Sequence, residues 1–220
     1  MERRSIVRER FERNRDEEKA EKMSAYMRGK FRFYGIPAPL RKTLYRDLLR
    51  EDRRAGRVDW AFLDACWDEE FREFQYLVAD YLACQQNRLT FEDVPRIKRF
   101  AKIRQWWDTI DCLDRVIGNI ALTDPRIDGL MLEWATDGDF WLRRLAIDHQ
   151  LGRKEKTNPE LLEKILVLNF GSSEFFINKA IGWSLRDYAK TDPEWVRDFL
   201  NRYRERMAPL SVREAEKHLG

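Results

Sequence analysis

A tripeptide pattern that recurs every 34 residues constrains the fold of this chain more than any other feature. Thr123-Asp124-Pro125, Thr157-Asn158-Pro159 and Thr191-Asp192-Pro193 repeat at that interval. An Asp or Asn followed by Pro is typical of a helix start, because the side chain accepts an orphan backbone N–H and proline has none to leave unpaired. Each tripeptide therefore marks the same point in a repeated helical unit.

The length of the repeat indicates the architecture. A period near 34 residues with two helices per unit predicts an α-solenoid, in which each helix pair buries its apolar face only against its neighbours. Tetratricopeptide repeats share this period, but their Trp-x-x-Leu-Gly-x-x-Tyr signature is not found here. The high charged fraction of 37% and the few glycines and prolines also favour helices. We predict an all-α solenoid of antiparallel HEAT-like helix pairs that forms one curved domain over residues 1–220, with a concave binding surface.

The first part of the chain is less regular than the repeats. Its apolar spacing and its breakers predict the following elements. They are one or two amphipathic helices over residues 5–28, an irregular aromatic and basic loop over 31–39, a helix opened by Pro39 that runs through Leu49, a charged connection over 50–57, and helices over 60–66 and 70–84.

The bulk composition excludes several classes of protein. Cys66, Cys84 and Cys112 match no zinc or redox spacing, and an odd number does not make a disulfide framework. His149 and His218 are isolated and match no metal spacing, so we expect no metal site. No apolar run approaches membrane-spanning length. We therefore expect a cytoplasmic protein without a membrane partner.

The second helices of the repeated units carry an unusual mixture of side chains. They begin near Gln105, Phe140 and Glu174, so we expect them to lie side by side. Their common stripe holds Trp107, Asp111, Asp114 and Arg115 in the first helix, Trp141, Arg144 and Asp148 in the second, and Phe175, Lys179, Trp183, Arg186 and Lys190 in the third. Cations neutralise phosphates and indole rings stack on sugar or base. A carboxylate among them would repel phosphate, which suggests that it faces a positive charge or holds a water.

Each of these positions also has an ordinary structural explanation. Trp106 is more typical of a core residue, and we interpret Trp67, Trp134, Trp141 and Trp195 as structural. Taken alone, Asp111 would be a first-turn carboxylate favoured by the helix dipole, and Arg144 a surface salt-bridge partner. The functional hypothesis rests on the stripe that these positions share.

Six sequence blocks, spread over nearly the whole chain, resemble the AlkD-type DNA glycosylases. The blocks are Tyr26-Met27, Phe33-Tyr34-Gly35-Ile36-Pro37, Trp106-Trp107-Asp108-x-x-Asp111, Trp141-Leu142-Arg143-Arg144-x-Ala146, Glu174-Phe175-Phe176-Ile177-x-Lys179-Ala180-Ile181-Gly182-Trp183-x-Leu185-Arg186-x-Tyr188-Ala189 and Leu210-Ser211-x-Arg213-Glu214-Ala215. The resemblance implies a DNA glycosylase of HEAT-like repeats that removes cationic alkylated purines, such as 3-methyladenine and 7-methylguanine, from duplex DNA without flipping the base.

The resemblance also implies roles for individual residues. The catalytic aspartate of the family falls on Asp111, its two sugar-cradling tryptophans on Trp107 and Trp183, and its backbone-gripping arginine on Arg144. The DNA-binding positions that it implies are Arg186, Lys179, Tyr26, Pro37, Ala38 and Arg213. The turn Pro37-Ala38-Pro39 departs from the polar residues of the family and offers less hydrogen bonding to the undamaged strand.

The chemistry agrees with this interpretation. An alkylated purine is already a cation and leaves without protonation, so the charge to stabilise is that of an oxocarbenium-like sugar. Asp111 can stabilise that charge and orient or activate water. We expect a monomeric, monofunctional enzyme that needs neither metal nor cofactor. Two alternatives remain: a non-catalytic HEAT-like module that binds damaged or structured DNA, and a protein-interaction scaffold.

Overall fold

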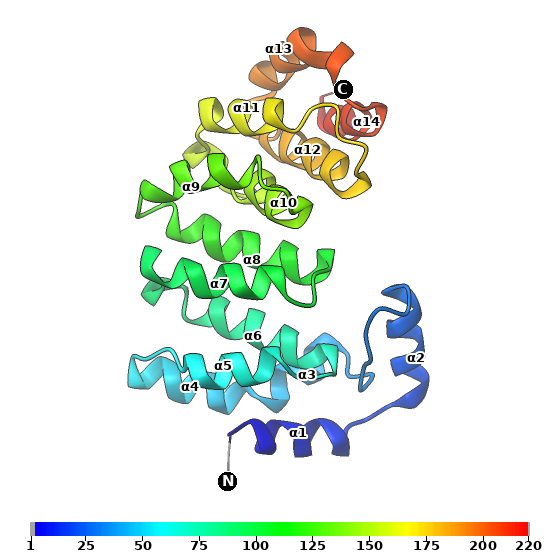
Figure 1. Cartoon of the computed structure of the whole chain (residues 1–220), viewed down its shortest axis with the longest axis vertical. Helices are drawn as coiled ribbons and strands as arrows, with labels where there is room; N and C mark the ends of the chain where they lie inside the picture. The colour runs from blue at the N-terminus through cyan, green and yellow to red at the C-terminus, as the bar shows by residue number, and fades with distance from the viewer. Residues whose placement is uncertain (1–2, 220) are drawn as a thin grey trace. The chain divides into compact units, whose positions relative to one another are not determined.

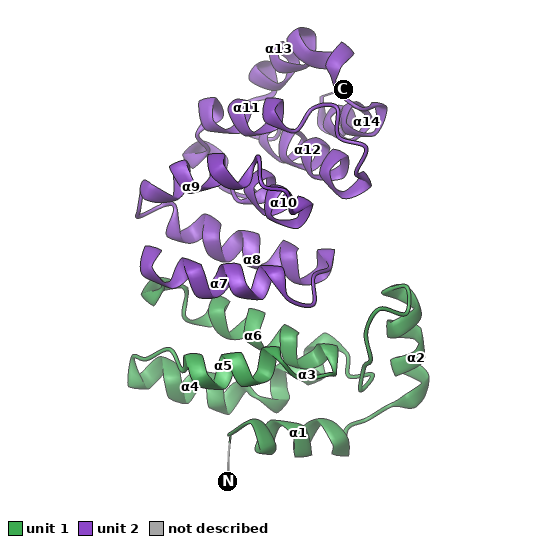
Figure 2. Cartoon of the chain, viewed as in Figure 1, with its two compact units in different colours: residues 1–89 green, residues 90–220 purple. Residues whose placement is uncertain are grey.

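The computed structural model describes residues 3–219, and this part of the chain contains fourteen α-helices and no β-strand. The predicted all-α fold of helix pairs is thereby confirmed. The helices group into two compact units, residues 1–89 and residues 90–220 (Figure 2). The single domain expected over residues 1–220 stays a prediction. No helix of the described residues is long and apolar enough to cross a membrane.

The first unit contains six α-helices around an aromatic core. They are α1 (Arg3–Arg13), α2 (Glu17–Tyr26), α3 (Ala38–Leu44), α4 (Arg46–Ala55), α5 (Trp60–Trp67) and α6 (Arg72–Cys84). Phe11 lies at the centre of this core, with its ring centroid 5.6 Å from that of Tyr34 and 5.1 Å from that of Phe74. These contacts hold α1 against α6 and against the loop that follows α2.

That loop is irregular as predicted, and buried groups fix its shape. Gly35 has φ +83°, and a Cβ at this position would overlap the backbone of Asp16. The buried Glu73 accepts hydrogen bonds from the backbone N–H groups of Gly35 (3.0 Å) and Ile36 (3.3 Å). Burial raises the pKa of Glu73, although these backbone hydrogen bonds oppose the rise. The loop is therefore a fixed structure that ends where α3 begins.

The structure corrects the predicted boundaries on either side of Leu49. The helix breaks at Tyr45, and α4 runs on to Ala55 through the segment expected to be a connection. The reason is that Asp52 faces the interior, where it accepts hydrogen bonds from Tyr81 (2.8 Å) and Arg3 (2.7 Å). Gly56, with φ 69°, then ends the helix in the left-handed region.

The second unit contains the repeats, stacked in chain order (Figure 1). Its helices are α7 (Val94–Lys102), α8 (Trp107–Ile120), α9 (Arg126–Trp134), α10 (Phe140–Asp148), α11 (Pro159–Leu168), α12 (Phe175–Tyr188), α13 (Pro193–Tyr203) and α14 (Pro209–Ala215). The second helices of the pairs are neighbours, because α10 packs against both α8 and α12. This confirms that the helices carrying the stripe lie side by side.

The Asp/Asn-Pro markers begin helices as expected, with one shift. Asn158 accepts from the backbone N–H of Leu161 (3.0 Å), and Asp192 accepts from that of Trp195 (2.9 Å), so both are N-caps. At the first marker α9 begins one residue later, after Pro125. Asp124 there accepts from the backbone N–H of Arg126 at 3.0 Å.

Two helical glycines differ sharply in what surrounds them. Gly118 lies on α8 where the chain leaving α10 approaches so closely that a Cβ would overlap the carbonyl oxygen of His149. Gly129 on α9 has open space at the same position among the described residues. Only the first glycine is required for packing.

We expect Gly118→Ala to lower the free energy of unfolding by about 1–3 kcal/mol, because the backbone of His149 cannot move aside without separating two helices. Gly129→Ala is the matched control, and it should raise the free energy of unfolding by up to about 1 kcal/mol. Urea denaturation of the two variants and the wild type measures both changes. Equal effects of the two substitutions would contradict the close packing at Gly118.

Candidate active site

A bidentate ion pair between α8 and α10 forms the centre of the candidate site. Arg144 donates from Nε to Oδ1 of Asp111 at 2.8 Å and from Nη2 to Oδ2 at 2.9 Å. The Arg144 side chain is 1% exposed, whereas that of Asp111 is 23% exposed. Planar pairs of this kind fix the orientation of the carboxylate. Asp111 therefore presents a held carboxylate that solvent and ligands can reach.

Arg144 also joins the third helix to this pair. Its Nη1 donates to the backbone carbonyl of Phe176 on α12 at 2.8 Å, and its guanidinium carbon lies 5.1 Å from the ring centroid of Trp183. Trp107, on the same face of α8 as Asp111, and Trp183 are both partly exposed. The structure thus brings Asp111, Arg144 and Trp183 together, as predicted.

Two further aspartates lie behind the ion pair. Asp111, Asp114 and Asp148 each place one carboxylate oxygen within 4.8 Å of the others. Asp114 and Asp148 are buried, and Asp148 lies 3.5 Å from Nη2 of Arg144. Three carboxylates are a donor set that suits a hard cation. Arg144 already bonds to both oxygens of Asp111, however, and supplies positive charge at this place.

The buried pair holds a proton near neutral pH. Burial raises the pKa of Asp148 to about 7 against the opposing charge of Arg144, and burial with the neighbouring Asp148 raises the pKa of Asp114 well above its ordinary range. Oδ1 of Asp114 has no hydrogen-bond partner among the described residues. Burial also raises the pKa of Asp111, although Arg144 opposes this rise. The proton on the buried pair limits the negative charge around Arg144.

The tryptophan wall on α12 is flanked by two cations that share one carboxylate. Lys179 and Arg186 each donate to Glu214 on α14 at 2.7 Å, and both lie within 6 Å of the Trp183 ring centroid. Burial favours the neutral form of Glu214, but the hydrogen bonds from Lys179 and Lys217 outweigh it and lower its pKa to about 2. Gly182 permits this arrangement, because a Cβ there would overlap the Glu214 side chain.

The remaining predicted residues lie in different surroundings. Trp106 is buried, with its ring centroid 5.6 Å from that of Trp141 and 5.2 Å from that of Phe176, as expected of a core residue. Arg213 is exposed on α14. The guanidinium of Arg144 bonds within the protein, so its expected contact with the DNA backbone stays a prediction.

The three predicted DNA-binding residues of the first unit are all exposed. Tyr26 ends α2 and is 70% exposed. Pro37 directly precedes α3, and Ala38 is its first residue. They belong to residues 1–89, whereas Asp111 belongs to residues 90–220. Their part in binding DNA stays a prediction.

Sequence reasoning assigned no role to Asp114, Asp148 or Glu214. The first two could have been found, because they occupy equivalent positions 34 residues apart on the stripe. Glu214 offers a weaker signal, since its pairing with Lys179 and Arg186 depends on how α14 packs on α12.

We expect Asp148→Asn to change how stability depends on pH. The pKa of Asp148 is about 7 in the folded chain and near 3.8 when unfolded, so the folded chain binds this proton more tightly. The resulting stabilisation is complete below pH 4 and is lost as the pH rises through 7. The free energy of unfolding of the variant, relative to the wild type, should therefore rise between these values by up to about 1.4 kcal/mol per pH unit.

Urea denaturation from pH 4.5 to 8 measures this difference. The free energies of unfolding of the two proteins must be subtracted from each other at each pH. The reason is that burial lowers the pKa of His149 to about 3, so in both proteins His149 makes stability increase with pH, opposite to the effect of Asp148. Asp198→Asn, an exposed change on α13, is the control. Parallel curves for Asp148→Asn and the wild type would contradict the raised pKa.

Comparisons with known proteins show the family to which this chain belongs. The family model described as DNA alkylation repair enzyme matches residues 7–219. A solved structure described as a predicted DNA alkylation repair enzyme from Enterococcus faecalis is similar, with a TM-score of 0.87 and 35% identity over 94% of this chain and 97% of that chain. A search of the curated proteins gave no match. The chain belongs to the family of DNA alkylation repair enzymes.

Proposed function

We propose that this chain is a monofunctional DNA glycosylase that hydrolyses the N-glycosidic bond of cationic alkylated purines in duplex DNA. Its substrates would include 3-methyladenine and 7-methylguanine, and it would act as a monomer. Membership of the family supports alkylated DNA as the substrate. The observation that carries the proposal is the partly exposed carboxylate of Asp111, held by both of its oxygens by Arg144, whose guanidinium carbon lies 5.1 Å from the ring centroid of Trp183.

The enzyme need not activate the base as a leaving group, because alkylation has already made the purine a cation. The purine leaves with the electron pair of the glycosidic bond and thereby loses its positive charge, so no general acid is required. The sugar becomes an oxocarbenium-like cation, as in glycoside hydrolysis. Water then adds its hydroxyl group to C1′ and releases a proton.

Asp111 is the residue that we propose to face the sugar. Its negative charge stabilises the cation, and its free lone pairs can accept a hydrogen bond from the attacking water. Arg144 prevents the carboxylate from rotating, so the charge is oriented before the substrate arrives. Arg144 is thus a positioning residue in the free protein.

The tryptophans are the second part of the mechanism. Their indole faces attract a cation by about 0.5–2 kcal/mol each, depending on how much water is excluded. We propose that Trp107 and Trp183 contact the deoxyribose from two sides, and that the base stays stacked because the charge develops on the sugar. Contacts with the DNA backbone are assigned to Arg186, Lys179 and Arg213, and contacts from the first unit to Tyr26, Pro37 and Ala38.

We expect Asp111→Asn to slow the release of 7-methylguanine from methylated duplex DNA at least about tenfold, which is 1.4 kcal/mol in the barrier. Duplex binding should be retained, because the substitution removes a negative charge from the DNA-facing surface. Single-turnover release measures the rate, and Asp198→Asn is the charge-matched control on α13. Undiminished release would refute the role of Asp111, whereas binding without release by the wild type would favour the non-catalytic DNA-binding module.

The cation–π contribution of Trp183 can be separated from its size. We expect Trp183→Ala to lower the single-turnover rate about 2- to 30-fold, the range that corresponds to the loss of one such contact. Trp183→Phe keeps an aromatic face next to Arg144 and should fall between the wild type and the alanine variant. Equal rates for the phenylalanine and alanine variants would contradict a cation–π role.

A further inference from the structure

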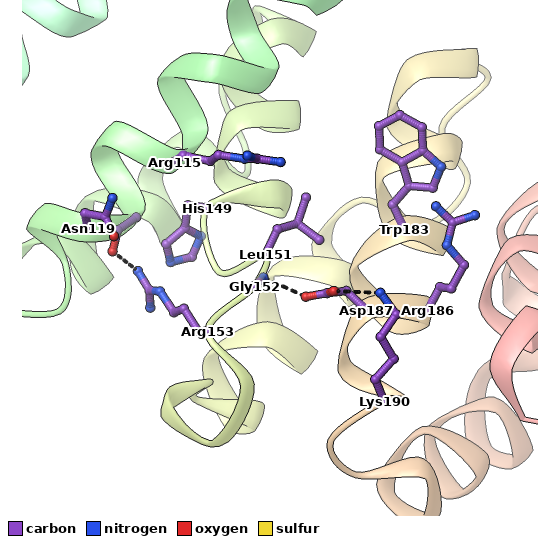
Figure 3. Close-up of a pocket in the computed structure, with 11 residues that line it drawn as sticks. Arg115, Asn119, His149, Leu151, Gly152, Arg153, Trp183, Arg186, Asp187 and Lys190 are labelled. Carbon is purple, nitrogen blue, oxygen red and sulfur yellow. Dashed lines mark hydrogen bonds and ion pairs between the residues drawn. The ribbon is translucent and has the colours of Figure 1, made fainter. Parts of the chain in front are cut away.

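A basic pocket of about 400 Å³ lies beside Trp183, entirely within residues 90–220 (Figure 3). Its walls come from α8, from the connection between α10 and α11, and from the end of α12. Four cationic side chains line it, namely Arg115, Arg153, Arg186 and Lys190. Except for Arg186, none of them has a role in the proposed reaction.

Two of these cations form no hydrogen bond or ion pair with a carboxylate of the described residues, although Asp111 and Asp114 lie near Arg115 and Asp128 lies near Arg153. Arg115 is exposed and makes no hydrogen bond or ion pair with any described residue. Arg153 is partly buried and donates to the carbonyl of Gly118 (2.6 Å) and to the side-chain oxygen of Gln150 (3.2 Å), which are both neutral. A partly buried charge without a directly bonded counter-charge is costly, and burial accordingly lowers the pKa of Arg153. The pocket therefore favours an anion.

The pocket also contains buried polar atoms that are unsatisfied. The His149 side chain is 2% exposed, and its Nδ1 pairs with the carbonyl of Ala146 at 2.6 Å. Burial and the charge of Arg153 lower the pKa of His149 to about 3, so the ring is neutral and Nε2 is an acceptor. Neither Nε2 of His149 nor Nε of Arg153 has a partner among the described residues. Figure 3 shows the His149 ring between Arg115 and Arg153.

These atoms fit a hydrated anion. An anion accepts directly from the arginines, and a water can donate one hydrogen to Nε2 of His149 and the other to an oxygen of the anion. The carboxylate that also lines the pocket, Asp187, is already engaged, because it accepts from the backbone N–H of Gly152 at 2.6 Å and lies 3.3 Å from Nζ of Lys190. It thus holds the wall of the pocket in place.

We propose that this pocket binds a phosphodiester of the DNA backbone, with Arg115 and Arg153 as its principal donors. The inference rests on the proposed function, because Trp183 forms both a wall of this pocket and one side of the proposed sugar site. A phosphate held here belongs to the damaged strand, close to the reacting nucleotide. Its capture sets the register of the sugar relative to Asp111.

Binding of undamaged duplex DNA, measured by fluorescence anisotropy at several salt concentrations, tests the pocket without any need for catalysis. Arg115→Gln should weaken binding about tenfold and reduce the slope of log K against log[salt] by about 0.9, the value for one lost phosphate contact. Lys164→Gln removes the same charge from an exposed site on α11 and is the control. Equal effects of the two variants would overturn the proposal.

Duplexes with one neutral methylphosphonate locate the phosphate. One position near the lesion should weaken binding by the wild type but not further weaken binding by Arg115→Gln, because both changes remove the same contact. Additive losses at every position would overturn the assignment. Inorganic phosphate, titrated at constant ionic strength, tests the other source of the same chemistry. Saturable binding that Arg115→Gln abolishes, with duplex affinity unchanged, would show a site for free phosphate instead of DNA.

The outcome for the pocket is independent of the outcome for the proposed function. Wild-type release of 7-methylguanine, combined with identical duplex binding by Arg115→Gln and Lys164→Gln, would refute the pocket alone. A wild type that releases no base, but loses duplex affinity specifically in Arg115→Gln, would refute the glycosylase assignment and retain the phosphate site.

Discussion

The buried guanidinium of Arg144 is the interaction on which the candidate site depends. It bonds to a carboxylate on α8, lies near another on its own helix, and donates to a backbone carbonyl on α12. A buried arginine without such partners would be strongly destabilising. The hydrogen bonds of Arg144 therefore fix both the packing of the three helices and the orientation of Asp111. A shift of one helix would disturb both.

The charge around Arg144 is balanced by a proton as well as by side chains. Three aspartates surround one arginine, and the buried pair Asp114 and Asp148 titrates far from the ordinary range. Asp111 is the member that solvent reaches, so it is the one that a ligand can contact. Asp114 and Asp148 lie behind it, and their combined negative charge increases as the pH rises, because their raised pKa values leave them partly protonated. The same ion pairs therefore determine both the packing of the helices and the charge of the site.

The repeat and the stripe could be predicted because both are local in sequence. A helix start such as Asn158-Pro159 is encoded by adjacent residues. Once the repeat aligns the second helices, helical spacing places Asp111, Arg144 and Trp183 on one stripe. The break at Tyr45 and the continuation of α4 could not be predicted, since they depend on the burial of Asp52 by Arg3 and Tyr81. The partnership of Glu214 with α12 and the unsatisfied Nε2 of His149 likewise arise only from packing.

The shared carboxylate of Glu214 has a consequence for the positive charge that α12 presents to solvent. Glu214 carries one negative charge and pairs with Lys179, Arg186 and Lys217, so it offsets only part of their positive charge. An anionic ligand at Lys179 or Arg186 would thus have to compete with Glu214. In a member of the DNA alkylation repair family, cations compensated in this way would release fewer counterions on binding DNA than uncompensated cations do.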